Sequence, residues 1–96
     1  MPILFCSLEI YLPYCHSLKE KRRVIKSASS RLRSRFNMGV AEIGYQDTWQ
    51  RCQLGAVAVG SDAVVLQKVS QHFIRECERI LGGDLVDHET EIFELD

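Results

Sequence analysis

The chain has 96 residues, of which 46% are hydrophobic and 26% are charged, a balance that is typical of a globular protein and excludes a disordered chain. This length supplies one hydrophobic core, so we expect one domain over residues 1–96. The net charge is -1, but residues 17–36 hold eight Lys or Arg and one Glu, whereas the rest of the chain holds four Lys or Arg and twelve Asp or Glu.

The first half of the chain predicts a strand and then a long helix. Residues 3–12 alternate with a fully apolar face, which predicts a strand, and Pro13 removes a backbone donor at its end. Ser17-Leu18-Lys19-Glu20 predicts a capping box, with Ser17 at the N-cap and Glu20 bonding back to it. A helix over residues 18–36 follows, with Asn37 and Gly39 at its end. Its apolar stripe consists of Leu18, Ile25, Ala28, Leu32 and Phe36.

The second half predicts two strands, a helix and a last strand. Residues 40–44 form a short strand, residues 45–51 a polar connection and residues 52–59 an apolar strand. Ser61-Asp62 begins a helix that Gly82-Gly83 ends, and residues 84–95 alternate as the last strand. The stripe of this second helix consists of Val65, Leu66, Val69, Phe73, Cys77 and Ile80.

The order of these elements predicts an α+β fold, a ferredoxin-like βαββαβ sandwich. Right-handed crossovers place both helices on one face of a four-stranded antiparallel sheet. The first and third strands are then central, and the second and fourth are edges. The acidic residues of the last strand, which discourage pairing with another chain, fit an edge. They are Asp87, Glu89, Glu91 and Glu94.

Several strings of residues resemble a known family. They are S-L-K-E-K-R-R from Ser17, R-F-N from Arg35, V-A-E from Val40, Q-D-x-W-Q-R from Gln46 and E-T-E-I from Glu89. In combination they resemble the YlxP-like proteins, a largely uncharacterised bacterial family, over nearly the whole chain. The resemblance implies a ferredoxin-like fold and a gene position often beside a translation initiation factor and a ribosome-binding factor. It supplies no established site residues.

The first helix carries one cationic flank beside its apolar stripe. On a helical wheel the flank spans about 100°. Its members are Lys19, Arg22, Arg23, Lys26 and Arg33. Clustered cations hold phosphate backbones, so RNA is the leading partner, and a solvated surface that keeps the protein in solution is the alternative. Lys21 falls within the stripe, where we expect its stem to pack on the sheet rim and its ammonium to stay in water.

The polar connection places an aromatic ring among hydrogen-bonding groups, and the topology brings it to the start of the first helix. Its candidate binding residues are Asp47, Trp49, Gln50 and Arg51. Together with Lys19, Lys21 and Arg22 they predict a seat for a phosphate and a stacked base at the helix N-terminus. The alternative is structural: Trp49 covers the core while Asp47 and Arg51 pair locally.

The open face of the sheet is apolar, with Ile3 and Phe5 on it. The central strands lack the aromatic residues on which RNA recognition motifs stack bases, so we exclude that mode. Homo-oligomerisation through this face would cover it, and partial burial by the termini is the alternative.

The chain lacks a recognisable catalytic apparatus, and we expect no enzyme activity and no cofactor. Four cysteines and three histidines stand at no metal-ligand spacing, and no phosphate-binding loop is present. An acylphosphatase of similar topology would need glycines and an arginine in residues 13–16, which are absent. No apolar run is long enough to cross a membrane and no signal peptide is visible, so we expect a cytoplasmic protein with reduced thiols.

The residues therefore favour a small accessory protein that binds RNA or the ribosome through its basic first helix. The alternative is a homo-oligomeric interaction module whose basic helix binds an acidic protein. A binder of small phosphate compounds ranks third.

Overall fold

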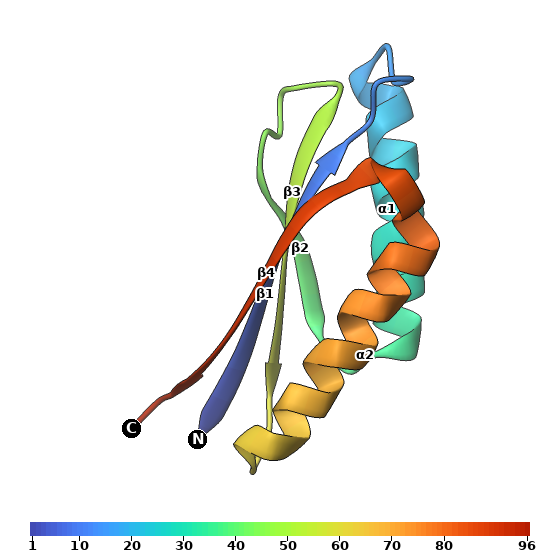
Figure 1. Ribbon diagram of the computed structural model, residues 1–96. Helices are drawn as coiled ribbons and strands as arrows, with labels where there is room; N and C mark the ends of the chain where they lie inside the picture. Colours follow the sequence, from blue (N-terminus) through green and yellow to red (C-terminus); the bar gives the residue numbers. More distant parts are fainter.

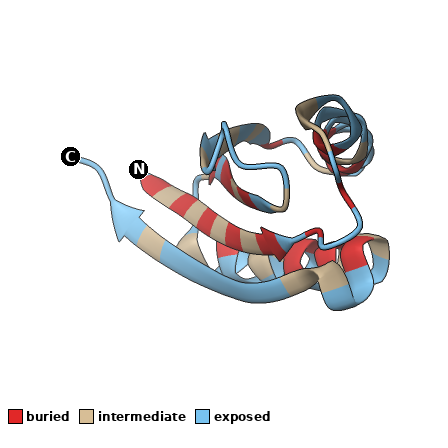
Figure 2. Cartoon of the chain, turned by 90° about the horizontal axis from the view of Figure 1, so that it is seen from above, coloured by how far each residue is buried: buried red, intermediate tan, exposed pale blue.

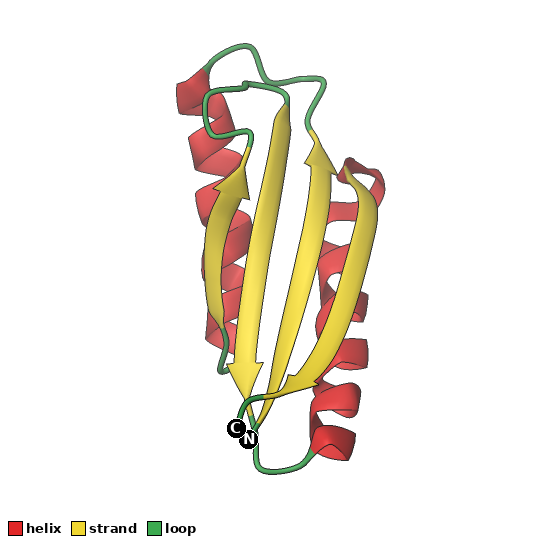
Figure 3. Cartoon of the chain, turned by 90° about the vertical axis from the view of Figure 1, so that its left-hand side faces the viewer, coloured by secondary structure: helices red, strands yellow, loops and turns green.

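The computed structural model describes all of residues 1–96, and it confirms the predicted ferredoxin-like βαββαβ order (Figure 1). The elements are β1 (Pro2–Tyr11), α1 (Leu18–Arg35), β2 (Gly39–Gly44), β3 (Arg51–Val59), α2 (Ala63–Leu81), a 3-10 turn η1 (Gly82–Asp84) and β4 (Leu85–Glu94). The antiparallel strands lie in the order β2-β3-β1-β4, so β1 and β3 are central as predicted. Both helices cover one face of the sheet, and the opposite face carries no helix (Figure 3).

The core lies between the helices and the covered face of the sheet. Even-numbered residues of β1, such as Leu4 and Leu8, point into it and are fully buried, which gives β1 its alternating pattern (Figure 2). α1 contributes Leu32 and α2 contributes Phe73 to this core. The Phe73 ring meets that of Phe36 edge to face, with 5.3 Å between centroids, an arrangement that favours aromatic pairs.

α1 begins as predicted but ends differently. Ser17 Oγ accepts from the Glu20 amide at 3.1 Å, whereas the Glu20 carboxylate accepts from the amide of His16 at 2.7 Å rather than from that of Ser17. At the other end no glycine caps the helix. Phe36 leaves it in an extended conformation at φ -129, packs against α2, and Gly39 already belongs to β2.

α2 starts at an Asp62 N-cap and ends at Gly82, whose φ of 55 is a conformation that glycine adopts freely. The prediction that Val65 belongs to the buried stripe of this helix is wrong. Val65 is 54% exposed, and Ile74 is buried instead. The stripe continues from Leu66 in steps of seven and eight residues, so Val65, one residue earlier, lies off the buried face.

The acidic residues of β4 lie mostly on the open face of the sheet. Asp87, Glu89 and Glu91 stand opposite the β1 residues whose side chains point away from the helices. Glu94 instead pairs with the N-terminal ammonium at 3.0 Å. The face of the sheet that carries no helix is therefore acidic along the exposed edge strand β4.

Candidate nucleic-acid interface

The two layers of the molecule carry opposite charges. Every lysine and arginine except Arg51 lies on α1 or α2. Of the acidic residues, only Glu20, Glu76 and Glu78 lie on those helices. The helix layer is therefore strongly cationic and the rest of the molecule anionic, although the whole chain is almost neutral.

The predicted cationic flank of α1 is exposed to solvent along its whole length. Its members are Lys19, Arg22, Arg23, Lys26 and Arg33. Only Arg33 has a partner, the carbonyl of Val40, to which it donates at 3.2 Å. The other four side chains form no ion pair and no hydrogen bond within the chain, so their charges are available to a ligand.

Lys21 departs from its predicted role as a cation in contact with solvent or ligand. Its side chain is 1% exposed, and Nζ lies 2.9 Å from Glu42 Oε2 on β2. Nζ also donates to the backbone carbonyl of Tyr45. The sheet edge supplies an acidic partner and a carbonyl directly beneath the lysine, so its charge is satisfied inside the protein. Lys21 is therefore removed from the candidate interface.

The connection between β2 and β3, residues 45–50, lies beside the loop that leads into α1, as the topology predicted (Figure 1). Gln50 joins them, since its amide nitrogen donates to the carbonyls of Pro13 at 3.1 Å and Cys15 at 3.3 Å. Tyr45 has a φ of 60, a left-handed conformation that is uncommon for a side chain of its size. Gln50 thus ties this connection to the loop before α1, and Lys21 ties it to α1 itself.

The structural alternative for Trp49 and its neighbours, in which Trp49 covers the core while Asp47 and Arg51 pair, is wrong. Trp49 is 50% exposed and does not cover the core. Arg51 does not pair with Asp47, because its guanidinium lies over the Tyr45 ring, 4.3 Å from the centroid, and 3.7 Å from Glu9. The Asp47 side chain forms no ion pair or hydrogen bond and is exposed. Trp49 is left as an exposed aromatic ring in a well-anchored connection.

The N-terminus of α1 is a poorer seat for a phosphate than predicted. Glu20 lies in the first turn, where its carboxylate accepts from the His16 amide. A negative charge therefore already occupies the positive end of the helix dipole, and Ser17 takes the free amide of Glu20. A phosphate at this position would meet like charge.

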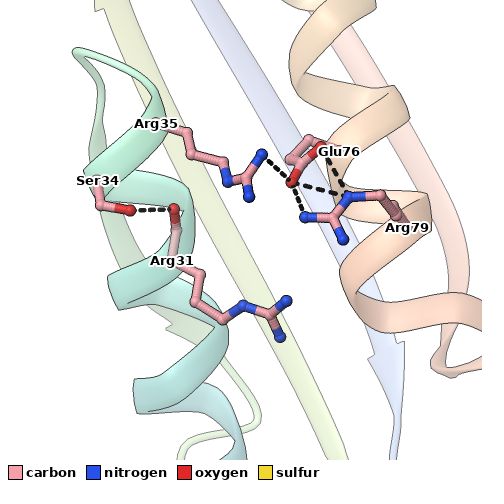
Figure 4. Close-up of polar contacts among 5 residues, drawn as sticks. All are labelled: Arg31, Ser34, Arg35, Glu76 and Arg79. Atoms are coloured by element: carbon pink, nitrogen blue, oxygen red, sulfur yellow. Dashed lines mark hydrogen bonds and ion pairs between the residues drawn. The ribbon is translucent and has the colours of Figure 1, made fainter.

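A second group of arginines, which sequence reasoning missed, faces the space between the helices (Figure 4). Glu76 on α2 pairs with Arg35 of α1 at 3.1 Å and with Arg79 one turn along α2. The hydrogen bond from Arg79, together with the charges of Arg35 and Arg31, holds the pKa of Glu76 below its usual value. Glu76 thus pairs with two arginines and leaves this group with a net positive charge, while the guanidinium of Arg31 has no hydrogen-bond or ion-pair partner. The four-residue spacing of Arg31 and Arg35 was the available signal for this cluster.

Next to this cluster a groove of about 320 Å³ runs between α1 and α2. The half-buried Val24 and Ile80 and the buried Ala28 contribute apolar surface to it, and Arg23 and Arg31 stand at its sides. We call this space the inter-helix groove. It combines apolar surface with two cations that form no ion pair.

Tyr14 and Asp84 form the end of the inter-helix groove that lies next to the start of α1 and the end of α2. The Tyr14 hydroxyl donates to Asp84 Oδ2 at 2.8 Å, joining the loop after β1 to the turn after α2. Partial burial, followed by this hydrogen bond and the Asp84 charge, raises the pKa of Tyr14 to about 12. The phenol is therefore protonated at neutral pH, and its ring is held in one position.

The cysteines are buried and unpaired. Burial raises the pKa of Cys6 to about 11 and that of Cys77 to about 12, and burial followed by the Glu42 charge raises that of Cys52 to about 12. The pKa of Cys15 is also raised, mainly by burial. These thiols are protonated at neutral pH, which makes them poor nucleophiles. No three of the His, Cys, Asp and Glu side chains gather as metal ligands would.

Neither helix is long and apolar enough to span a membrane.

Comparison with known proteins identifies a matching family model and one curated relative. The model of a family described as protein of unknown function (DUF503) matches residues 3–90. The curated relative "Uncharacterized protein YlxP" of Bacillus subtilis (strain 168) is 43% identical over 70 residues, which cover 73% of this chain and 76% of that protein. The resemblance to YlxP-like proteins is confirmed.

Solved structures with low sequence identity share the fold. A putative antibiotic biosynthesis monooxygenase from Bordetella bronchiseptica has a TM-score of 0.55 at 11% identity, covering 100% of this chain and 99% of that chain. A dimeric ferredoxin-like protein of unknown function from Thermobifida fusca has a TM-score of 0.53 at 18% identity, covering 99% of this chain and 92% of that one. At these identities the likeness concerns the fold alone.

Proposed function

This chain belongs to the family of proteins of unknown function DUF503, and from its own residues we propose that it is an accessory protein that binds RNA through the helix layer. The ribosome is the setting that the resemblance to YlxP-like proteins suggests. Binding, rather than catalysis, is the activity that its chemistry supports. The buried thiols are protonated, and no cluster of His, Cys, Asp and Glu side chains could hold a metal ion.

The observation that carries the proposal is the segregation of charge. Four cations of the α1 flank, Lys19, Arg22, Arg23 and Lys26, are exposed and have no partner inside the chain. A row of free cations on a rigid helix attracts a phosphate backbone, and the counterions released on binding favour the complex. The acidic open face of the sheet repels the same ligand. RNA should therefore approach from the helix side only.

A salt series tests this proposal. Affinity for a single-stranded RNA should fall steeply between about 50 and 200 mM salt, with a logarithmic slope of about 3 if the four free cations of the α1 flank each contact a phosphate. Replacing Arg22, Arg23 and Lys26 by Gln should lower that slope by about 2 and weaken binding at low salt. Fluorescence anisotropy of a labelled RNA measures both quantities.

The matched control changes net charge equally at another place. Ser61→Glu, Gln67→Glu and Gln71→Glu, all at exposed positions, lower the net charge by the same amount without touching the α1 flank. This control variant should keep the wild-type slope. Equal affinity of both triple variants, or no binding by the wild type at low salt, would contradict the proposal. Capture of an acidic protein by the flank in the absence of RNA binding would favour the interaction-module alternative.

We further propose that two copies associate through the open face of the sheet. Val57 and Val59 on β3 and Ile43 on β2 are exposed large apolar residues on the uncovered side, 44%, 65% and 46% exposed. The Thermobifida fusca protein of similar fold is described as dimeric, which supports self-association of this chain. The helix layers would then face outward on both sides of the dimer and remain free for RNA.

A further inference from the structure

The inter-helix groove has features that a generally cationic surface does not need. Its apolar surface lies between two helices, and its two arginines belong to the same face of α1, eight residues apart. Glu76 is paired with Arg35 and Arg79, whereas Asp84, which accepts a hydrogen bond from the neutral Tyr14 phenol, keeps its charge at one end of the groove. Two arginines and one carboxylate line the groove, so it carries a net positive charge beside apolar surface, which suits a ligand that is both anionic and partly apolar.

We infer that the inter-helix groove receives one unpaired nucleotide of the bound RNA. Its nucleobase contacts the apolar surface of the groove, and its flanking phosphates lie on Arg23 and Arg31. This inference rests on the proposed function and deepens it. A single-stranded RNA is the occupant because the free cations Arg22 and Lys26 continue from the Arg23 side along α1, where further phosphates of the same strand would lie. A free mononucleotide would leave those cations unused.

Size and chemistry agree with one nucleotide. A volume of about 320 Å³ lies at the lower end of the range for small-ligand pockets. It suits a single nucleobase and sugar and is too small for a folded RNA hairpin. RNA is read by splaying out a base, stacking it on an aromatic ring or a guanidinium plane, and bonding its edge. The groove offers each of these: the Tyr14 ring, the Arg31 guanidinium, and the Asp84 carboxylate as an acceptor for a base N–H.

The contact between Tyr14 and Asp84 prepares this end of the groove. The hydroxyl is bonded at 2.8 Å, so the ring is held in place before any ligand arrives, and less entropy is lost when a base stacks on it. Only one carboxylate oxygen takes the phenol, which leaves the other for the base. Tyr14 remains about half exposed, so its ring is accessible.

Two exposed serines of α1 give a matched pair of variants for the test. Ser27 lines the groove and Ser30 does not, and neither side chain has a hydrogen-bond partner. Ser27→Phe should fill the groove and weaken binding of a single-stranded RNA about tenfold, while the salt slope stays at the wild-type value because no cation is removed. Ser30→Phe should bind as the wild type does.

A fluorescent base gives a direct readout of stacking. An RNA of about ten nucleotides carrying one 2-aminopurine should lose fluorescence on binding to the wild-type protein, and should lose less on binding to the Ser27→Phe variant. Tyr14→Ala should weaken binding roughly 5- to 100-fold, and Tyr14→Phe, which keeps the ring, by much less. A fully paired RNA duplex should show no dependence on Ser27.

The outcomes separate this inference from the proposed function. RNA binding with the expected salt slope, but with equal affinities for Ser27→Phe and Ser30→Phe, would overturn the groove inference and leave the cationic interface intact. Displacement of the 2-aminopurine RNA by free adenosine monophosphate at concentrations as low as those of the unlabelled oligonucleotide would overturn the assignment to an RNA strand. Absence of RNA binding by the wild-type protein would overturn both.

Discussion

At the scale of single residues, Lys21 shows how tertiary structure changes the role of a side chain. It stands among exposed cations in the sequence, yet it is buried against Glu42 and bonded to the Tyr45 carbonyl. The same carbonyl accepts from the Thr48 amide at 3.0 Å. These two bonds hold Tyr45 in its left-handed conformation, which costs a residue with a side chain about 1 kcal/mol. Lys21 is therefore a structural anchor for the connection that presents Trp49.

Replacing Lys21 by Met should lower the free energy of unfolding by about 2 kcal/mol, because the variant leaves the Glu42 carboxylate without its partner. The figure is below the cost of breaking a fully buried pair, because the Glu42 side chain is 26% exposed. Urea denaturation measures this loss. Trp49, the one tryptophan of the chain, reports the connection itself, and its fluorescence anisotropy should fall.

Lys19→Met is the control for that variant, since Lys19 is an exposed lysine on the same turn of α1. It removes the same charge and should leave both readouts at wild-type values. The double variant Lys21→Met and Glu42→Gln should be more stable than Lys21→Met alone, because the orphaned charge is gone. If Lys21→Met and Lys19→Met behave alike, the anchoring role is wrong.

At the scale of elements, the ion pair between Glu76 of α2 and Arg35 joins α2 to α1, and Arg79 on α2 itself holds the same carboxylate. The pKa of Glu76 is lowered, chiefly by the hydrogen bond from Arg79 and also by the charge of Arg35. A carboxyl group whose pKa is lower in the folded than in the unfolded state stabilises the fold above its ordinary pKa. That contribution is lost as the pH falls through the lowered value.

Glu76→Gln should therefore reduce the thermal unfolding midpoint at pH 7, and the difference from the wild type should shrink as the pH falls below about 4. Glu78→Gln, which removes an exposed carboxylate without an ion pair on the same helix, is the control and should change little at either pH. A deficit of Glu76→Gln that is equal at pH 7 and at low pH would show that the charge of Glu76 does not stabilise the fold.

Most elements were predictable from the sequence because their signals are local. The alternation of β1, the Ser17 and Asp62 N-caps and the glycine after α2 each depend on neighbouring residues. The burial of Lys21 was not predictable in this way, because its partner Glu42 belongs to a strand whose register only the folded sheet defines. The inter-helix groove likewise depends on how two helices pack. Arg31 looks like any exposed cation until α2 is placed beside it.

At the scale of the whole molecule, the open face of the sheet is divided. Its apolar part lies over β2, β3 and the beginning of β1, and its acidic part runs along β4. A two-fold axis across the strands would place the acidic β4 of one copy against that of the other, which is unfavourable. An axis that runs along β3 would stack apolar on apolar surface and leave the two acidic strands at opposite rims in water. Association along β3 is therefore the arrangement that we expect.

The last prediction is that changing β3 alone converts a dimer to a monomer. Val57→Lys together with Val59→Lys should disperse the apolar patch and place like charges face to face across the two-fold axis, so sedimentation equilibrium should give the mass of one chain. Val64→Lys together with Val65→Lys makes the same change at two equally exposed valines of α2, 58% and 54% exposed, and should leave the dimer intact. A stable interface needs about 800 Å² from each partner, and the open face is the one uncovered side of the sheet. A wild-type chain that stays monomeric at millimolar concentration, or a β3 variant that stays dimeric, would show that two copies do not associate through this face.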